Sequence, residues 1–262
     1  MQRTVEVERQ AGVATLWMNR PDLHNAFDAT LIAELTAALC TLDGDPEIRA
    51  VVLAGRGESF CAGADVNWMR GAATFTEAEN RRDATALAQM LRMLALLSKP
   101  TVARIHGAAI GGGLGLVSAA DIAIASSRAV FATPEVRLGL IPATIGPHVV
   151  AAIGERQARR YFLTAERISA VRAQAIGLVH EVVEPEQLDA AVAKIVAALL
   201  AGGPKAQQAS KELLREIAGQ PLSEALALAT AERIARLRLT VEAAEGLGAF
   251  LEKRPPAWIG SS

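Results

Sequence analysis

The glycine-dense stretch at residues 107–113 can do chemistry with its backbone rather than with its side chains. Gly107, Gly111, Gly112 and Gly113 follow an apolar run at residues 100–105 that predicts a strand, and a run of small residues after them predicts a helix. Glycine lets the backbone approach a ligand closely, and the first N–H groups of a helix are unpaired at its positive end. Such groups suit an oxygen that becomes negative during a reaction. The glycines alone are equally compatible with a tight turn and close helix packing.

A carboxylate and a second loop of small residues are also of chemical interest. Glu135 lies in the loop Thr133-Pro-Glu, and residues 59–65 (Ser-Phe-Cys-Ala-Gly-Ala-Asp) follow a strand of the buried type. A carboxyl group in a mostly apolar pocket has a raised pKa, so Glu135 is a candidate general acid or base. The alternative roles are a helix cap or an ion pair for Glu135 and an ordinary strand-to-helix connection for the loop.

The composition argues against several classes of function. Of the 262 residues, 51% are hydrophobic and 21% are charged, which allows a large core. A net charge of −1 without a basic block disfavours nucleic acid as the main partner. The two cysteines form no CxxC pair and the histidines are scattered, so we expect neither a metal site nor a disulfide framework. We find no dinucleotide-binding glycine motif after the first strand, no P-loop and no nucleophile elbow. No leader and no membrane-length apolar run is seen, which predicts a cytoplasmic protein.

The elements that must position these loops alternate between strands and helices. Residues 2–9 and 13–18 predict a hairpin, residues 50–54 a buried strand, and residues 28–42 and 77–97 two helices. Further short strands at 122–125, 129–131 and 179–183 alternate with helices, which indicates an α/β fold. The segment Gly202-Gly-Pro204 separates two predicted regions, a body over residues 1–200 and a helical region over residues 201–262.

Three segments, in this order and spacing, resemble the enoyl-CoA hydratase/isomerase (crotonase) superfamily. They are residues 59–65, residues 105–115 (Ile-His-Gly-Ala-Ala-Ile-Gly-Gly-Gly-Leu-Gly) and residues 131–142 (Phe-Ala-Thr-Pro-Glu-Val-Arg-Leu-Gly-Leu-Ile-Pro). Asn19-Arg-Pro, Asn25-Ala and the ending Phe250-Leu-Glu-Lys-Arg-Pro-Pro also match the family's pattern. Each motif is weak alone, but the ordered set covers nearly the whole chain and is specific.

The resemblance implies a fold, an assembly and a ligand. The implied fold is a spiral of repeated ββα units followed by a helical C-terminal region that serves trimerisation, and such proteins are usually trimers or dimers of trimers. The implied ligand is an acyl-CoA thioester, with no cofactor beyond the CoA that the substrate carries. Neither nucleic acid nor a membrane is implied as a partner.

The resemblance also assigns roles to particular residues. The backbone N–H groups of Ala64 and Gly112 would hold the thioester oxygen as it becomes an enolate. The adenine of CoA would lie near Ala62 and Val66. Positive side chains would meet the CoA phosphates, and the candidates are Lys253, which would reach a neighbouring subunit's ligand, and, with a solvated surface role as the alternative, Arg20 and His24.

One position departs from the pattern of many hydratases in this family, which place two glutamates around one water. The later glutamate corresponds to Glu135, but the earlier one corresponds to Gly115, so this second-glutamate position lacks a carboxylate. Water with another polar group, or part of the substrate, would then fill the space. Local features similar to a 3-methylglutaconyl-CoA hydratase branch suggest a substrate with its own distal carboxylate. We hypothesise that Arg81, Arg82 or another arginine binds that carboxylate.

Three functions follow, in order of preference. The first is an enoyl-CoA hydratase that adds water through an enolate, with Glu135 handling protons. The second is a double-bond isomerase that uses one glutamate, which the Gly115 departure favours. The third is a non-catalytic acyl-CoA binder. Four apolar residues are candidates for the lining of the acyl pocket, although apolar residues at such spacing more often belong to the plain core: Trp68, Met69, Met90 and Leu94. His148 and Tyr161 are candidates for a second acid–base group, with a structural role preferred for each.

Overall fold

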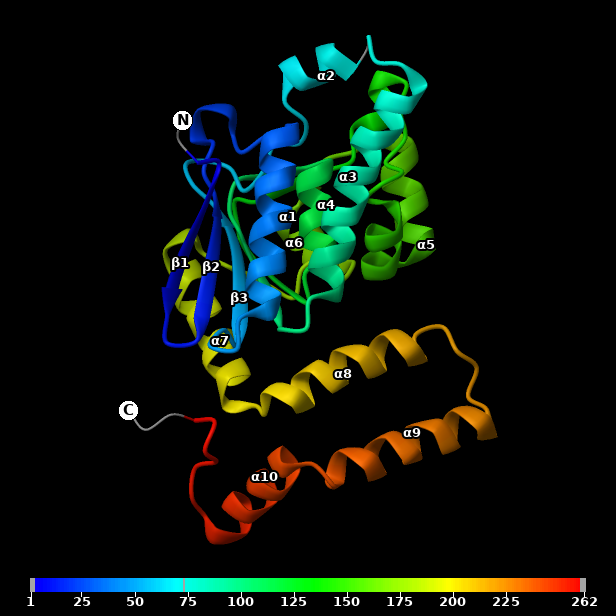
Figure 1. The fold of residues 1–262 in the computed structure, drawn as a ribbon. Coiled ribbons are helices and arrows are strands. Elements are labelled where there is room, and N and C mark those ends of the chain that lie inside the picture. The colour runs from blue at the N-terminus through cyan, green and yellow to red at the C-terminus, as the bar shows by residue number, and fades with distance from the viewer. Residues whose placement is uncertain (1–2, 73, 260–262) are drawn as a thin grey trace.

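The computed structural model describes residues 3–72 and 74–259 and contains two sheets (Figure 1). The larger sheet has six strands in the order β1-β2-β3-β4-β6-β9, and only the β1–β2 hairpin is antiparallel. Its strands are β1 (Val5–Gln10), β2 (Val13–Met18), β3 (Ala50–Gly55), β4 (Thr101–Ile105), β6 (Ile122–Ser126) and β9 (Glu181–Val183). The hairpin and the buried strand at residues 50–54 are therefore confirmed.

The smaller sheet has the order β5-β7-β8, from β5 (Ala108–Ile110), β7 (Val130–Ala132) and β8 (Ile168–Ser169). Strands β4 and β6 of the large sheet are each followed by a strand of the small sheet and then a helix, which is the repeated ββα unit expected from the resemblance. Strand β5 was not predicted: three residues, Ala-Ala-Ile, are too short to show a period.

Helices cover both faces of the large sheet. On one face α1 (Ala29–Gly44), α3 (Glu77–Leu96) and α4 (Gly112–Ala119) lie side by side (Figure 1). On the other face α7 (Leu188–Ala201) packs Leu188 and Val192 against Val52, Val102 and Ile124 of the strands. The other helices of the body are α2 (Val66–Ala72), α5 (Gly146–Thr164) and α6 (Ala170–Ala175), with 3-10 helices η1 (Pro21–Leu23), η2 (Glu135–Leu138) and η3 (Pro185–Gln187).

Local sequence explains where the first long helices begin. The Asp28 side chain accepts a hydrogen bond from the Leu31 N–H and caps α1, the helix predicted over residues 28–42. Thr76 and Glu79 form a capping box at the start of α3. The apolar faces of these helices meet in the main core, where Met90 and Leu94 are fully buried. These two residues therefore belong to the core.

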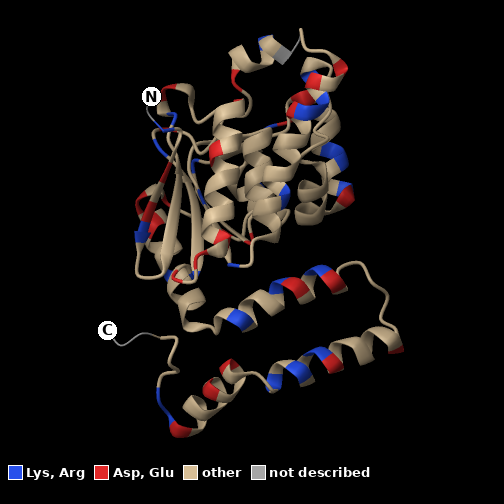
Figure 2. Ribbon diagram, in the orientation of Figure 1, with Lys and Arg blue, Asp and Glu red and all other residues tan. Residues whose placement is uncertain are grey.

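Three helices extend from the body at the end opposite α2 (Figure 1): α8 (Pro204–Ile217), α9 (Glu224–Arg238) and α10 (Val241–Glu252). Acidic and basic residues are interspersed along α8 and α9 (Figure 2). The Lys211 ammonium of α8 lies 2.6 Å from an Asp121 carboxylate oxygen and ties this region to the body. The division into two domains at residues 200 and 201 stays a prediction.

No single helix among the described residues is long and apolar enough to cross a membrane. The segments Pro185–Ala201 and Pro204–Ile217 meet that test only as a pair, by length and composition, and the chain bends by 104° between them.

Candidate active site

A cavity of about 390 Å³ lies where the two small-residue loops meet. The loop around Ala64, the start of α4 and the segment that contains η2 form its walls, and α2 and α3 close one side. Its lining combines mostly apolar and glycine residues with few polar ones: Ala62, Gly63, Ala64, Trp68, Met69, Asp83, Leu87, Ile110, Gly111, Gly112, Pro134, Glu135, Leu138, Leu140, Ile141, Pro142, Thr144 and Ile145.

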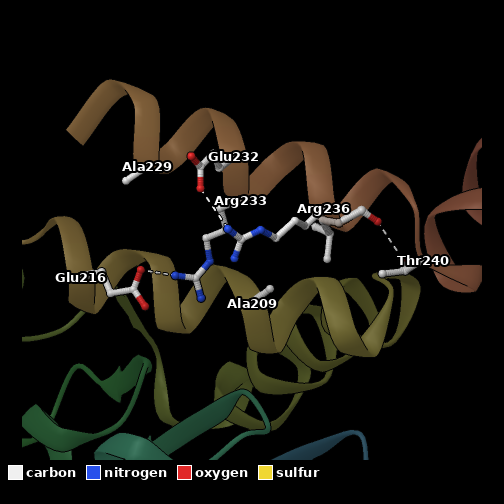
Figure 3. A pocket seen from close by; sticks show the side chains of 8 residues that line it. Ala209, Glu216, Ala229, Glu232, Arg233, Arg236 and Thr240 are labelled. Atoms are coloured by element: carbon white, nitrogen blue, oxygen red, sulfur yellow. Dashed lines mark hydrogen bonds and ion pairs between the residues drawn. The ribbon is translucent and has the colours of Figure 1, made fainter. Parts of the chain in front are cut away.

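A larger cavity of about 530 Å³ lies between α8 and α9, and its charged side chains are already paired with one another (Figure 3). Arg233 forms ion pairs with Glu216 and Glu212, and Arg236 pairs with Glu232 at 2.9 Å. This cavity contains none of the residues predicted to do chemistry, so the smaller cavity is the candidate active site.

The backbone N–H groups of Ala64 and Gly112, both in the cavity wall, have no acceptor among the described residues. Phe27 forms backbone hydrogen bonds with the residues on both sides of Ala64. Its N–H donates to the Gly63 carbonyl at 2.7 Å, and its carbonyl accepts from the Asp65 N–H at 2.8 Å. The Gly112 N–H is at the first position of α4, where a helix leaves its N–H groups unpaired. The structure therefore brings the two predicted N–H groups to the same cavity.

The glycines of α4 are required by close approach to neighbouring backbone and side chains. A Cβ on Gly112 would lie 2.6 Å from the Phe27 ring, and one on Gly113 would lie 2.3 Å from the Cys61 carbonyl oxygen. Gly111, just before the helix, has a φ of +51°, which disfavours other residues. Side chains at these positions would push the start of α4 away from the Ala64 loop.

Arg20 holds the Ala64 loop against the start of α1. One guanidinium nitrogen lies 2.9 Å from carboxylate oxygens of both Asp28 and Asp65, and the Arg20 side chain is 12% exposed. Burial raises the pKa of Asp65, but hydrogen bonds from the Asn67 and Trp68 N–H groups and from Arg20 outweigh it and hold the pKa below its usual value. These ion pairs favour a structural role for Arg20 over the predicted contact with phosphates.

Glu135 projects its carboxyl group toward the start of α4. A Cβ on Gly111 would lie 3.3 Å from Oε1 of Glu135. Oε2 is buried and has no hydrogen-bond partner within the described part of the chain. Burial raises the pKa of Glu135 above its usual value. The arrangement fits a proton-transferring group better than the cap or ion pair considered as alternatives.

The expectation that Gly115 leaves space for water or substrate is wrong. A Cβ on Gly115 would lie 2.4 Å from Cγ2 of Ile145 and 3.3 Å from Cδ1 of Leu91. Both side chains are buried, so apolar atoms already fill this position. A glutamate at residue 115 would require Ile145 to be replaced or displaced.

The structure does not support the hypothesis that Arg81 or Arg82 binds a distal carboxylate. Both are exposed, Arg81 pairs with Glu77 at 3.1 Å, and neither lines the cavity. The charged residue that α3 presents to the cavity is instead Asp83, whose Oδ1 accepts a hydrogen bond from Trp68 Nε1 at 3.1 Å. Burial raises the pKa of Asp83.

Asp83 was not predicted as a site residue, although its position in the sequence carries a signal. Asp83 precedes Leu87 by four residues and Met90 by seven, so it lies on the apolar stripe of α3. A carboxylate on the core-facing stripe of a helix is expected to have a specific role, because its desolvation is unfavourable.

The remaining predicted residues are scattered. Ala62 lines the cavity, and its N–H donates to the His24 carbonyl at 2.9 Å, while Val66 is exposed at the start of α2. His24 is exposed, and Nδ1 lies 3.1 Å from the Ser59 hydroxyl oxygen. Lys253 ends α10, which Figure 1 shows at the opposite end of the molecule from α2.

The two candidates for a second acid–base group do not line the cavity. The Tyr161 hydroxyl accepts a hydrogen bond from Arg172 at 2.9 Å, and the Tyr161 ring is buried in the core. His148 lies on α5, and burial lowers its pKa. Trp68 and Met69, by contrast, line the cavity as considered. Within residues 3–72 and 74–259, His, Cys, Asp and Glu side chains form no group of three that could hold a metal ion.

A family model, sequence relatives and a solved structure all connect this chain to the same family. A family model described as Enoyl-CoA hydratase/isomerase matches residues 8–261. The chain is 34% identical to the crotonyl-CoA hydratase of Syntrophomonas wolfei over 97% of this chain and 96% of the relative. It is also 34% identical to the short-chain-enoyl-CoA hydratase of Clostridium acetobutylicum over 95% of each. The crystal structure of an enoyl-CoA hydratase from Shewanella pealeana superposes with a TM-score of 0.95 at 42% identity, covering 97% of this chain and 96% of that one.

Proposed function

Because the chain belongs to the enoyl-CoA hydratase/isomerase family, we propose that it adds water across the double bond of a 2-enoyl-CoA thioester. The observation that carries the proposal is that one mostly apolar cavity brings together three polar groups suited to this reaction, none of them paired among the described residues. They are the N–H groups of Ala64 and Gly112 and the Oε2 oxygen of Glu135. Two preorganised donors suit an oxygen that gains charge, and the carboxyl group suits proton transfer.

In this proposal the thioester oxygen accepts hydrogen bonds from the Ala64 and Gly112 N–H groups. When water attacks the β-carbon, the electrons of the double bond move toward that oxygen and form an enolate. Fixed donors stabilise the developing charge without reorganising, and one such donor contributes about 2.7–4 kcal/mol in other enzymes. The glycines of α4 support this role by allowing the helix start and the Ala64 loop to approach each other.

Glu135 would transfer the protons. As a carboxylate it removes a proton from water while the water oxygen bonds to the β-carbon. As the resulting acid it returns a proton to the α-carbon when the enolate collapses, so one water is added and Glu135 is regenerated. Burial raises the pKa of Glu135, which eases formation of its protonated state between the two steps.

The test follows the ultraviolet absorbance of the conjugated enoyl thioester with crotonyl-CoA as substrate. We expect absorbance to fall with the wild-type protein and a hydroxyacyl-CoA product to form. Glu135→Gln should reduce kcat by about 10²- to 10⁴-fold, the usual contribution of a positioned acid or base. Glu186→Gln, at an exposed glutamate, is the matched control and should leave kcat unchanged. A Glu135→Gln variant that folds and retains wild-type kcat would refute the proposed role.

A double-bond isomerase is the second candidate, and the packing at Gly115 favours it. Ile145 fills the position of the second glutamate, which leaves Glu135 to move one proton between carbons. The two reactions differ in their products, because hydration incorporates solvent oxygen and isomerisation does not. The mass of the product after reaction in water labelled with oxygen-18 distinguishes them. The same measurement is repeated with 3-enoyl-CoA esters as alternative substrates.

We also propose a trimer or a dimer of trimers, in which Lys253 binds the CoA phosphates of a neighbouring subunit. Large apolar side chains on and next to α8–α10 are exposed in the single chain, as expected of a surface that another subunit covers: Leu214, Leu222, Leu239, Val241, Phe250 and Leu251. Light scattering after size exclusion measures the assembly. The cytoplasmic location stays a prediction from the sequence.

A further inference from the structure

The charged side chains that line the candidate active-site cavity, where the acyl chain of the substrate would bind, are all of one sign among the described residues. Within the described residues, the charged side chains that line the cavity are Asp83 and Glu135, and both are acidic. Glu135 already has a role in the proposed reaction, but Asp83 does not. Asp83 is partly buried, and even partial removal of a carboxylate from water is unfavourable unless other groups compensate for it, so Asp83 requires an explanation.

We propose that Asp83 selects the acyl group: it disfavours chains that end in a carboxylate and binds chains that end in a hydrogen-bond donor, such as a hydroxyl group. This inference rests on the proposed action on enoyl-CoA thioesters. It reverses the preference for a distal carboxylate that Gly115 suggested. Asp83 is therefore a selectivity residue, whereas Glu135 acts at the reacting carbons.

The contacts of Asp83 leave one oxygen available. Oδ1 accepts the hydrogen bond from Trp68 Nε1, and the Trp68 ring packs against the main core, so the carboxyl group has a fixed orientation. Among the described residues, Oδ2 has no hydrogen-bond donor and Asp83 has no ion-pair partner. An acceptor oriented in this way, in a cavity with apolar walls, can receive a hydrogen bond from a ligand.

The neighbouring cations do not neutralise this charge. Arg81 is 72% exposed on its side chain and pairs with Glu77. Arg82 is exposed, and Arg70 contacts the Asn67 side chain at 3.3 Å. A carboxylate at the end of an acyl chain would therefore meet two like charges in the cavity without a lining cation, which is unfavourable at low local dielectric.

A purely structural role for Asp83 would be to accept the Trp68 N–H. Asparagine can also accept that bond with the same shape, so Asp83→Asn separates the two roles. It keeps the contact with Trp68 and removes the charge. Glu77→Gln is the matched control, because it removes an exposed acidic side chain from the same helix.

The experiment uses three enoyl-CoA esters of equal chain length that end in a methyl group, a hydroxyl group or a carboxylate. We expect kcat/KM of the wild-type protein to be at least about 10²-fold lower for the carboxylate ester than for the hydroxyl ester, because like charges in close contact are strongly unfavourable. Asp83→Asn should narrow that ratio at least about tenfold, mainly through KM, as expected for loss of uniform binding. The methyl ester should change little, and Glu77→Gln should behave as wild type.

Calorimetric binding of the same esters separates failure of this inference from failure of the proposed reaction. Absence of turnover with every ester would refute the reaction, while the order of affinities would still test Asp83. Equal use or binding of the carboxylate and hydroxyl esters by the wild-type protein would overturn the inference. So would an Asp83→Asn variant that keeps the wild-type ratio.

Discussion

The close packing of Ile145 against Gly115 predicts that Gly115→Ala destabilises the wild-type protein but stabilises a variant that lacks the Ile145 side chain. In the wild-type protein, an alanine methyl at residue 115 would lie 2.4 Å from Cγ2 and 3.0 Å from Cβ of Ile145. Carbon atoms pack best at about 3.5–4.0 Å. Ile145 is β-branched and 2% exposed, so it has little freedom to move away.

The magnitude follows from two opposing effects. Replacing glycine by alanine inside a helix stabilises it by about 1 kcal/mol. Overpacking of a tight core costs about 1–3 kcal/mol, and the short approach to Ile145 places this case at the upper end. We therefore expect Gly115→Ala to lower the free energy of unfolding by about 1–2 kcal/mol in the wild-type background, as the difference between these effects.

Removal of the Ile145 side chain should reverse this result. Ile145→Ala alone should cost about 2–5 kcal/mol, because it leaves a cavity. In that background Cγ2 is absent and only Cβ of residue 145, at 3.0 Å, must relax into the new cavity, so Gly115→Ala should raise the free energy of unfolding by up to about 1 kcal/mol. The coupling between the two sites is then about 1–3 kcal/mol, within the range for residues in contact.

Urea unfolding of the four proteins, followed by circular dichroism, measures the cycle. The protein concentration must be the same throughout, because the free energy of unfolding of an oligomer depends on it. Two results would refute the reasoning: a Gly115→Ala variant more stable than wild type, or equal effects of Gly115→Ala in both backgrounds within about 0.5 kcal/mol. A confirmed cycle would mean that a glutamate at residue 115 also needs a smaller residue at 145.

Two further predictions concern Glu135 and Arg20. Burial raises the pKa of Glu135, so the folded protein binds this proton more tightly than the unfolded chain, whose carboxyl titrates near 4.5. The free energy of unfolding should therefore fall as pH rises from 4.5 through the pKa of Glu135 in the folded protein. Glu135→Gln should be more stable than wild type at neutral pH but not below pH 4.5. Urea unfolding across a pH series measures this, and a constant difference in the free energy of unfolding between the two proteins would contradict it. Arg20→Ala leaves Asp65 buried without its partner and should cost about 3–5 kcal/mol in urea unfolding. Arg159→Ala breaks the exposed ion pair between Arg159 and Glu155 of α5 and should cost less than about 1 kcal/mol, so equal losses in the two variants would argue against a structural role for Arg20.

Much of the fold was predictable because its signals are local. The strand at residues 50–54 and the helix that begins after Asp28 were both expected, and the structure contains β3 and α1 there. A buried strand requires a short apolar run, and a helix start requires an acceptor for its first N–H groups, so each is visible within a few residues. The short strand β5 was missed because three residues contain no period.

The candidate site was predictable where backbone geometry requires particular residues. The glycines near Gly112 and the small residues around Ala64 indicated two loops of close backbone approach, and the structure brings both loops to one cavity. Side chains on a helix were harder to place. Arg82 and Asp83 are adjacent in sequence, but successive residues of a helix point about 100° apart, so one is exposed and the other lines the cavity.

Local sequence was enough to predict most strands and helices in their order, the family, and the glycine-dependent junction at the start of α4. The packing of distant elements was needed to show that Ile145 fills the space beside Gly115, that Arg20 pairs with Asp65, and that the charged side chains lining the cavity are acidic. The physical reason is the range of the interactions. Element formation depends on neighbours a few residues away, whereas the contents of a cavity depend on which side chains remain when elements distant in the chain pack together.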